Sequence, residues 1–117
     1  MSYRILVGNQ PIGTSELEYH DQGIAFGTFH PLAPYQAVRP VFLLFTAALP
    51  FSGGTPDKRQ LAEYYAARDR LGLVLETQDG TSMTTGFIHI VDWGEGEEDH
   101  MEIEVQVMDP RFDWKTT

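Results

Sequence analysis

The sequence contains no cysteine. A disulfide framework, a thiolate metal site, a cysteine nucleophile and a thiol redox switch are therefore excluded. Long apolar runs are also missing: the most apolar stretch, residues 41–49, is bounded by Pro40 and Pro50, whereas a membrane-spanning helix needs about 20 such residues. We therefore expect no membrane span.

The N-terminus does not show the pattern of a secretion signal. Only three apolar residues follow Arg4 before Gly8, which is far shorter than the apolar stretch of a signal peptide. From this we expect a cytoplasmic protein.

Positive charge is scarce. Eight Lys and Arg stand against 17 Asp and Glu, which gives a formal net charge of -9 and a pI of about 4.6. Binding to nucleic acid by neutralising its phosphates requires the opposite balance, so we expect no such binding. A basic protein is the partner that this charge favours.

The acidity is confined to one part of the chain. Residues 1–70 contain six acidic and six basic residues, whereas residues 71–110 contain ten acidic residues and no Lys or Arg. Seven of these ten fall between residues 92 and 104, which we call the acidic segment. They are Asp92, Glu95, Glu97, Glu98, Asp99, Glu102 and Glu104.

Three interpretations of the acidic segment compete. It is a solubilising surface that also protects a sheet edge, a docking surface for a basic partner, or a cation site. A calcium-binding loop counted from Asp92 would need Gly at its sixth position and Glu at its twelfth, but Glu97 and Ile103 occupy them. We therefore predict no metal and no cofactor, and retain the acidic segment as a candidate binding site.

The order of the predicted elements indicates an α+β fold in one domain over residues 1–117. Three β segments open the chain, at residues 4–7, 12–19 and 23–29, and three close it, at residues 73–77, 84–93 and 101–108. Two helices lie between these β-rich halves. We expect the helices on one face of a mostly antiparallel sheet, with a small SH3-like barrel carrying a helical insertion as the alternative.

The first helix is predicted at residues 40–49, where Pro40 suits the first helical position and Pro50 prevents extension. A buried strand is the competing interpretation, because the run is short. The second helix is predicted at residues 56–71, with Thr55 as its N-cap and Gly72 at its end. An exposed sheet edge or helix face would also suit a homodimer.

The second predicted helix carries a further candidate binding cluster, formed by Tyr64, Tyr65 and Arg68. Residues 64 and 68 are one turn apart and share a face. The rings either pack in the core with Arg68 reaching solvent, or form an aromatic and guanidinium anchor for a partner. A third alternative pairs Arg68 with Asp92 or Glu76.

Motifs of catalysis are weak in this chain. Neither a nucleophile elbow nor a phosphate-binding loop is present, and no two of the four histidines, His20, His30, His89 and His100, have a zinc-binding spacing. His89 lies inside the apolar segment 87–91, where a histidine is more often a hydrogen-bonded structural residue than a catalyst.

Three functions follow as hypotheses. The first is a protein-interaction module of the inhibitor or immunity type, whose acidic surface binds a basic protein. The second is a small enzyme with its site in a groove between the helix at 56–71 and the sheet, using His89, Tyr65 or Arg68. The third is a structural subunit of an assembly. A concave pocket that joins at least two of those three side chains is the feature that the enzyme hypothesis requires.

Overall fold

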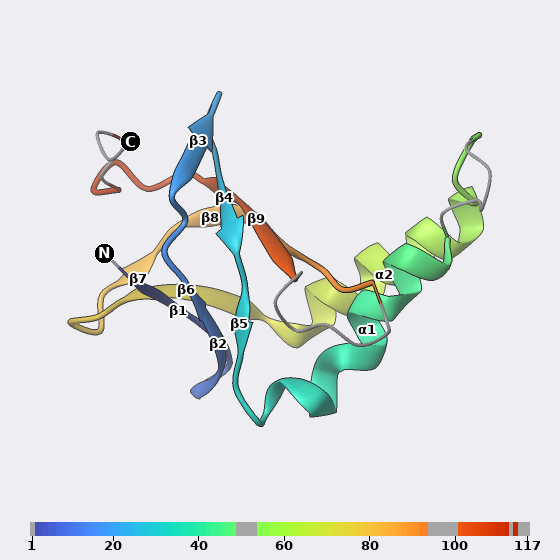
Figure 1. The fold of residues 1–117 in the computed structure, drawn as a ribbon, viewed down its shortest axis with the longest axis horizontal. Helices are drawn as coiled ribbons and strands as arrows, with labels where there is room; N and C mark the ends of the chain where they lie inside the picture. Colours follow the sequence, from blue (N-terminus) through green and yellow to red (C-terminus); the bar gives the residue numbers. More distant parts are fainter. Residues whose placement is uncertain (1, 49–53, 94–100, 113, 115–117) are drawn as a thin grey trace.

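A computed structural model describes residues 2–48, 54–93, 101–112 and 114. Its described part is an α+β fold in which two helices follow five strands in the chain and precede four more, and in space the helices stand together at one side of the strands (Figure 1). The helices are α1 (Tyr35–Ala47) and α2 (Lys58–Leu71). The strands are β1 (Tyr3–Val7), β2 (Gln10–Ser15), β3 (Tyr19–Asp21), β4 (Ile24–Thr28), β5 (His30–Pro31), β6 (Leu73–Thr77), β7 (Ser82–Met83), β8 (Thr85–Val91) and β9 (Glu102–Val107).

The described strands form two sheets rather than one. The five-stranded sheet has the order β5-β2-β1-β6-β7, and the four-stranded sheet has the order β3-β4-β9-β8. Every recorded strand pair is antiparallel. The chain passes from the first sheet to the second after β2 and returns after β4, so each predicted β-rich half contributes strands to both sheets.

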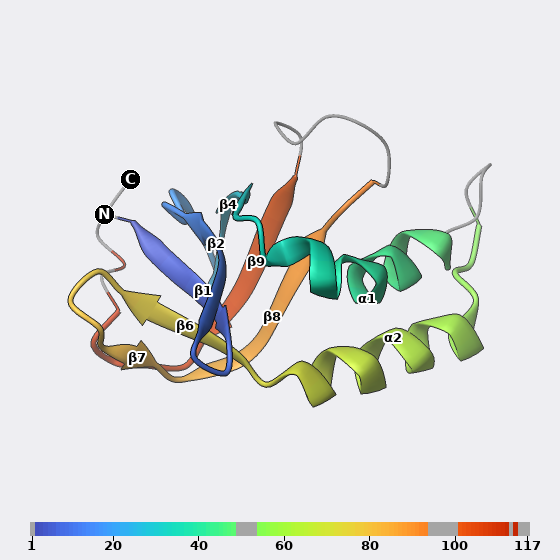
Figure 2. The ribbon, with the colours of Figure 1, turned by 90° about the horizontal axis from the view of Figure 1, so that it is seen from below.

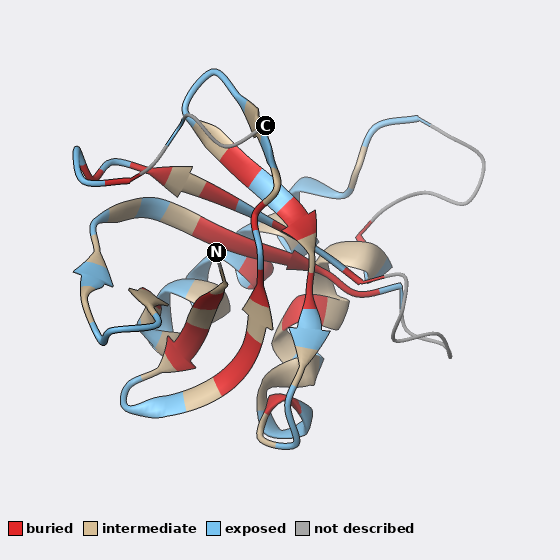
Figure 3. Ribbon diagram, turned by 60° about the vertical axis from the view of Figure 1, so that its left-hand side comes forward, coloured by how far each residue is buried: buried red, intermediate tan, exposed pale blue. Residues whose placement is uncertain are grey.

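The core contains residues from both sheets and both helices. Ile5 and Leu75 from the five-stranded sheet, Ile90 and Ile103 from the four-stranded sheet and Phe42 of α1 are all fully buried. Buried positions alternate with more exposed ones along β4 and β9, whereas the last four residues of β8 are all buried (Figure 3). In β9 the alternation matches the prediction, since Ile103, Val105 and Val107 face the core.

Helix α1 begins at Tyr35, five residues before the predicted start, so Pro40 lies inside the helix. A proline in a helix interior removes one backbone hydrogen bond and crowds the preceding turn. The longer helix buries Tyr35 and Phe42 on one face, at 1% and 0% exposure. We attribute the earlier start of α1 to this burial, because the free energy gained by burying the two rings outweighs the cost of placing Pro40 inside the helix.

Helix α2 ends where the sequence predicted, at Gly72, which adopts the left-handed conformation with φ 64°. Its beginning differs from the prediction. Asp57, and not Thr55, is the N-cap, because its carboxylate accepts a hydrogen bond from the Gln60 backbone N–H at 3.0 Å.

The two helices form a hairpin that stands at one end of the sheets, next to β8 (Figure 2). Phe42 and Tyr64 contact each other across the hairpin, with ring centroids 6.3 Å apart. Neither of these helices is long and apolar enough to cross a membrane. Because the hairpin lies beside β8, it borders the face of the four-stranded sheet that points away from the core, which we call the outward face.

Candidate functional site

The outward face of the four-stranded sheet carries two exposed members of the acidic segment. Glu102 and Glu104 alternate with buried residues along β9 and are both exposed. Cross-strand pairing places Phe26 of β4 on one side of Glu104 and His89 of β8 on the other. We call Glu102 and Glu104 the acidic ridge, because it divides this face into two hollows.

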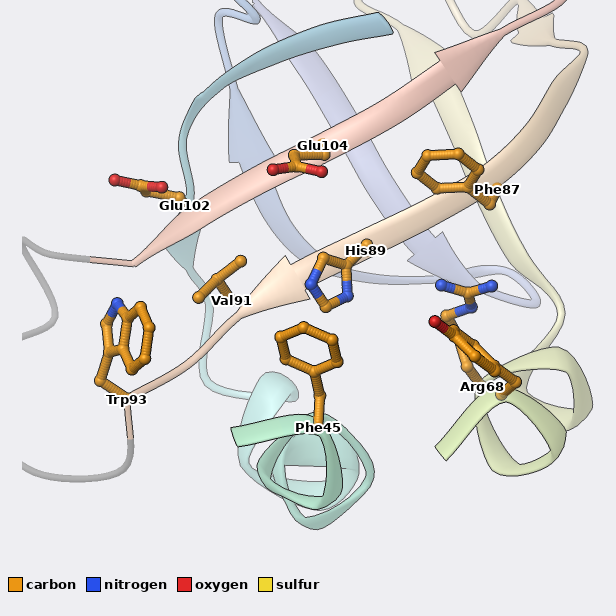
Figure 4. Close-up of a pocket in the computed structure, with 9 residues that line it drawn as sticks. Phe45, Arg68, Phe87, His89, Val91, Trp93, Glu102 and Glu104 are labelled. Atoms are coloured by element: carbon orange, nitrogen blue, oxygen red, sulfur yellow. The ribbon is translucent and has the colours of Figure 1, made fainter. Parts of the chain in front are cut away.

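The larger hollow, of about 470 Å³, lies between the acidic ridge and the helix hairpin (Figure 4). Both helices, strands β8 and β9 and the segment after β8 contribute to it. Its lining residues are Phe45, Tyr65, Arg68, Phe87, His89, Val91, Trp93, Glu102 and Glu104. It therefore joins Tyr65, Arg68 and His89, the three side chains that the enzyme hypothesis places in one groove.

Aromatic rings surround Arg68. Its guanidinium carbon lies 5.2 Å from the ring centroid of Tyr64, 5.1 Å from that of Tyr65 and 5.7 Å from that of Phe87. The side chain is 14% exposed, and its Nε lies 4.0 Å from a carboxylate oxygen of Asp69. Arg68 is thus held at the α2 end of the larger hollow.

The pairing of Arg68 with Asp92 or Glu76 does not form. Arg39 donates from Nε to Asp92 at 2.9 Å, and Arg4 donates to Glu76 from Nε at 2.9 Å and from a terminal nitrogen at 2.6 Å. Both carboxylates therefore have another arginine as their partner.

Asp92 is a structural residue of the described chain rather than an exposed member of the acidic segment. It is 2% exposed and accepts hydrogen bonds from the Tyr35 hydroxyl at 2.7 Å and from Arg39 at 2.9 Å. Burial and the adjacent Asp92 carboxylate raise the pKa of Tyr35 well above its usual range. This clamp ties the start of α1 to the end of β8.

His89 forms the floor of the larger hollow. It is 8% exposed, its ring centroid lies 4.4 Å from that of Phe45, and its Nδ1 is hydrogen-bonded to the Tyr64 hydroxyl. Burial, with a contribution from the positive charge of Arg68, lowers the pKa of His89 to about 4. Burial also raises the pKa of Tyr64 to about 12. Both groups are therefore neutral at pH 7.

Tyr64 and His89 form a buried hydrogen-bonded pair, and the guanidinium carbon of Arg68 lies 5.2 Å from the Tyr64 ring centroid. A neutral imidazole carries its proton on one of its two ring nitrogens. The Tyr64 hydroxyl therefore donates to Nδ1 in one tautomer of His89 and accepts from Nδ1 in the other. The Tyr64 side chain is fully buried, and its ring packs against Phe45, Tyr65 and His89, which line the larger hollow.

The smaller hollow, of about 190 Å³, lies on the other side of the acidic ridge. Its walls are Tyr19, Phe26, Gly27 and Thr28 together with Glu102, Ile103 and Glu104. The rings of Tyr19 and Phe26 are stacked with centroids 5.5 Å apart, and they are 59% and 36% exposed. Exposed aromatic rings therefore flank the acidic ridge on both sides.

The structure brings together four of the ten predicted site residues: Tyr65, Arg68, Glu102 and Glu104 line the larger hollow. Glu95, Glu97, Glu98 and Asp99 lie outside the described residues. Sequence reasoning missed Tyr19, Phe26, Phe45, Phe87 and Trp93. A signal existed for Phe26, because an aromatic residue between Ala25 and Gly27 has no core position when Ala25 faces inward.

Comparison of the chain with protein-family models, with curated proteins and with solved structures found no match. Over residues 2–48, 54–93, 101–112 and 114, no group of three His, Asp or Glu side chains is placed to hold a metal ion. The geometry of the two hollows is thus the basis for the function proposed below.

Proposed function

We propose that this protein is an interaction module that binds a basic partner protein through the outward face of its four-stranded sheet. The observation that carries the proposal is the acidic ridge, because Glu102 and Glu104 form a shared wall of two hollows lined by exposed aromatic rings. An inhibitor or immunity protein, which covers a basic functional surface of another protein, is the sharpest form of this function.

Two physical effects support a cationic binding partner. Carboxylates attract a positive charge and steer its approach. Residues 71–110 contain no Lys or Arg, and Arg68 is the basic residue among those that line the larger hollow. Aromatic faces add cation–π attraction for an ammonium or guanidinium group. Trp93, which is 61% exposed, offers such a face on the Glu102 side of the larger hollow (Figure 4).

The test is a calorimetric titration with a hexa-arginine peptide, at low and at moderate salt. We expect binding that weakens as salt rises, since part of the attraction is screened. The double variant E102Q/E104Q should weaken binding about tenfold, which corresponds to about 1.4 kcal/mol for two partly desolvated charge contacts.

The matched control is the double variant E16Q/E63Q, which changes the net charge by the same amount. Glu16 and Glu63 are exposed and line neither hollow. We expect less than about a twofold change for this control, because neither carboxylate lines a hollow and salt screens the attraction of exposed charges that do not contact the peptide. Equal weakening by both double variants would mean that the peptide responds to net charge alone, and the proposal would be abandoned.

The enzyme hypothesis keeps one specific observation in its favour, since the larger hollow joins Tyr65, Arg68 and His89. In that case Arg68 would hold an anionic substrate group beside the imidazole of His89. With a pKa of about 4, His89 is a weak base at pH 7. Phosphate and acetate titrated into the protein separate the two functions, because an anion that shifts the NMR signals of His89 and Arg68 favours the enzyme.

A further inference from the structure

The two hollows share one wall. Glu102 and Glu104 line both of them, with Phe26 and Tyr19 on the β4 side and the helix hairpin on the β8 side. We infer that the partner segment is an extended peptide that crosses the acidic ridge, with an arginine or lysine in the larger hollow and a large apolar residue two positions away in the smaller one. This inference rests on the proposed function and adds the chemistry of the partner.

Spacing supports an extended peptide. The two hollows lie on either side of β9, over β4 and β8, and neighbouring strands lie about 4.8 Å apart, so the floors of the hollows are two strand spacings, roughly 10 Å, apart. Alternate side chains of an extended chain point to the same side and lie about 6.8 Å apart. Residues i and i+2 of the peptide reach both hollows because the long aliphatic stem of an arginine or lysine covers the remaining distance.

The basic residue belongs in the larger hollow. Arg68 occupies the α2 end of this hollow, whereas Trp93 stands at the opposite end, on the side of Glu102 (Figure 4). A cation that enters near Trp93 contacts an aromatic face and both carboxylates of the acidic ridge, and it stays on the opposite side of the hollow from the positive charge of Arg68.

The apolar residue belongs in the smaller hollow. Tyr19 and Phe26 present stacked rings to solvent there, and a volume of about 190 Å³ suits a single side chain better than a longer segment. A free amine would fill the larger hollow only and leave these rings in water. The pair of hollows therefore favours a peptide over a small organic cation.

The experiment titrates four capped peptides into the full chain and follows the NMR signals of Tyr19 and Trp93. The peptide sequences are Gly-Phe-Gly-Arg-Gly, Gly-Phe-Arg-Gly-Gly, Gly-Phe-Gly-Gly-Arg and Gly-Ala-Gly-Arg-Gly. We expect the first, with Phe and Arg two positions apart, to bind about tenfold more tightly than the other three, because only this peptide fills both hollows. Both residues should shift with this peptide.

A variant tests the contribution of the smaller hollow separately from that of the larger hollow. Tyr19→Ala should weaken binding of Gly-Phe-Gly-Arg-Gly about tenfold and leave binding of Gly-Ala-Gly-Arg-Gly unchanged. Leu32→Ala is the matched control, because Leu32 is a large apolar residue with 43% exposure that lines neither hollow. It should change neither affinity.

The outcomes distinguish the inference from the function on which it rests. If E102Q/E104Q weakens all four peptides but Tyr19→Ala weakens none and the spacing has no effect, the crossing peptide is refuted and the basic partner stands. If E102Q/E104Q also has no effect, the proposed function itself fails. NMR shifts at Trp93 without shifts at Tyr19 in the unmodified protein would likewise refute binding of the peptide in the smaller hollow.

Discussion

The buried imidazole of His89 should make the stability of this protein depend on pH between about 4 and 6.5. Its pKa is about 4 in the folded chain, against an ordinary value of 6.5. Above pH 6.5 both states are neutral and stability is complete. As pH falls below 6.5 the unfolded chain takes up a proton that the folded chain excludes, so stability is lost down to about pH 4.

The size of this loss follows from the pKa difference. One pKa unit corresponds to about 1.4 kcal/mol. The full window therefore amounts to about 3 kcal/mol, of which about 2 kcal/mol is lost between pH 7.5 and pH 5.0. This is a large part of the marginal stability of an ordinary domain.

The assay compares the unmodified protein with His89→Gln. Glutamine does not titrate, and its side-chain oxygen can accept a hydrogen bond from the Tyr64 hydroxyl. Urea unfolding at pH 7.5 and at pH 5.0, followed by tryptophan fluorescence, gives the free energy of unfolding of each protein. Because all other titrating groups are common to both, the unmodified protein should lose about 2 kcal/mol more than the variant on acidification.

Two results would refute the reasoning about His89. The first is the same loss of stability in both proteins. The second is an NMR titration of the folded protein that places the pKa of His89 near 6.5, which would mean that burial and the Arg68 charge do not disfavour the imidazolium. A destabilised variant with the expected loss of pH dependence would leave the argument intact.

Two further substitutions test the local interactions that hold the helices. Tyr35→Phe removes the hydroxyl that donates to the buried Asp92 carboxylate and should lower the free energy of unfolding by about 2 kcal/mol. Calorimetry should record a fall in Tm of about 4 °C per kcal/mol, and an unchanged Tm would show that this hydroxyl does not stabilise the fold. Asp57→Ala removes the N-cap of α2 and should cost about 1 kcal/mol in urea unfolding, whereas Asp57→Asn, which can still accept the bond, should cost less than half of that.

The sequence predicted the features that depend on local pattern. The alternation of β9 places Ile103 and Val105 inward and Glu104 outward as expected, and Gly72 ends α2 in the conformation that glycine favours. These signals were readable because each depends on a period of two residues or on one backbone angle. The predicted groove between α2 and the sheet also corresponds to the larger hollow.

Features that depend on contacts between residues far apart in the chain could not be predicted from the sequence. The interior Pro40 made a helix beginning at Tyr35 unfavourable on local grounds, and only the burial of Tyr35 and its bond to Asp92 show why the helix extends there. The division into two sheets also depends on contacts between distant parts of the chain, since β1 pairs with β6, which follows both helices in the sequence. The residue pattern of one strand does not determine which other strand pairs with it.

The same non-local contacts make the candidate site. The outward face of β8 and β9 is walled on one side by the helix hairpin, and the Tyr35–Asp92 clamp fixes that hairpin to the end of β8. Trp93 follows directly after Asp92, so the clamp also sets where the chain leaves the strand beside the larger hollow. Loosening the clamp should therefore disturb the hollow as well as the fold, whereas the smaller hollow, whose walls come from β4, β9 and Tyr19 of β3, should keep its shape.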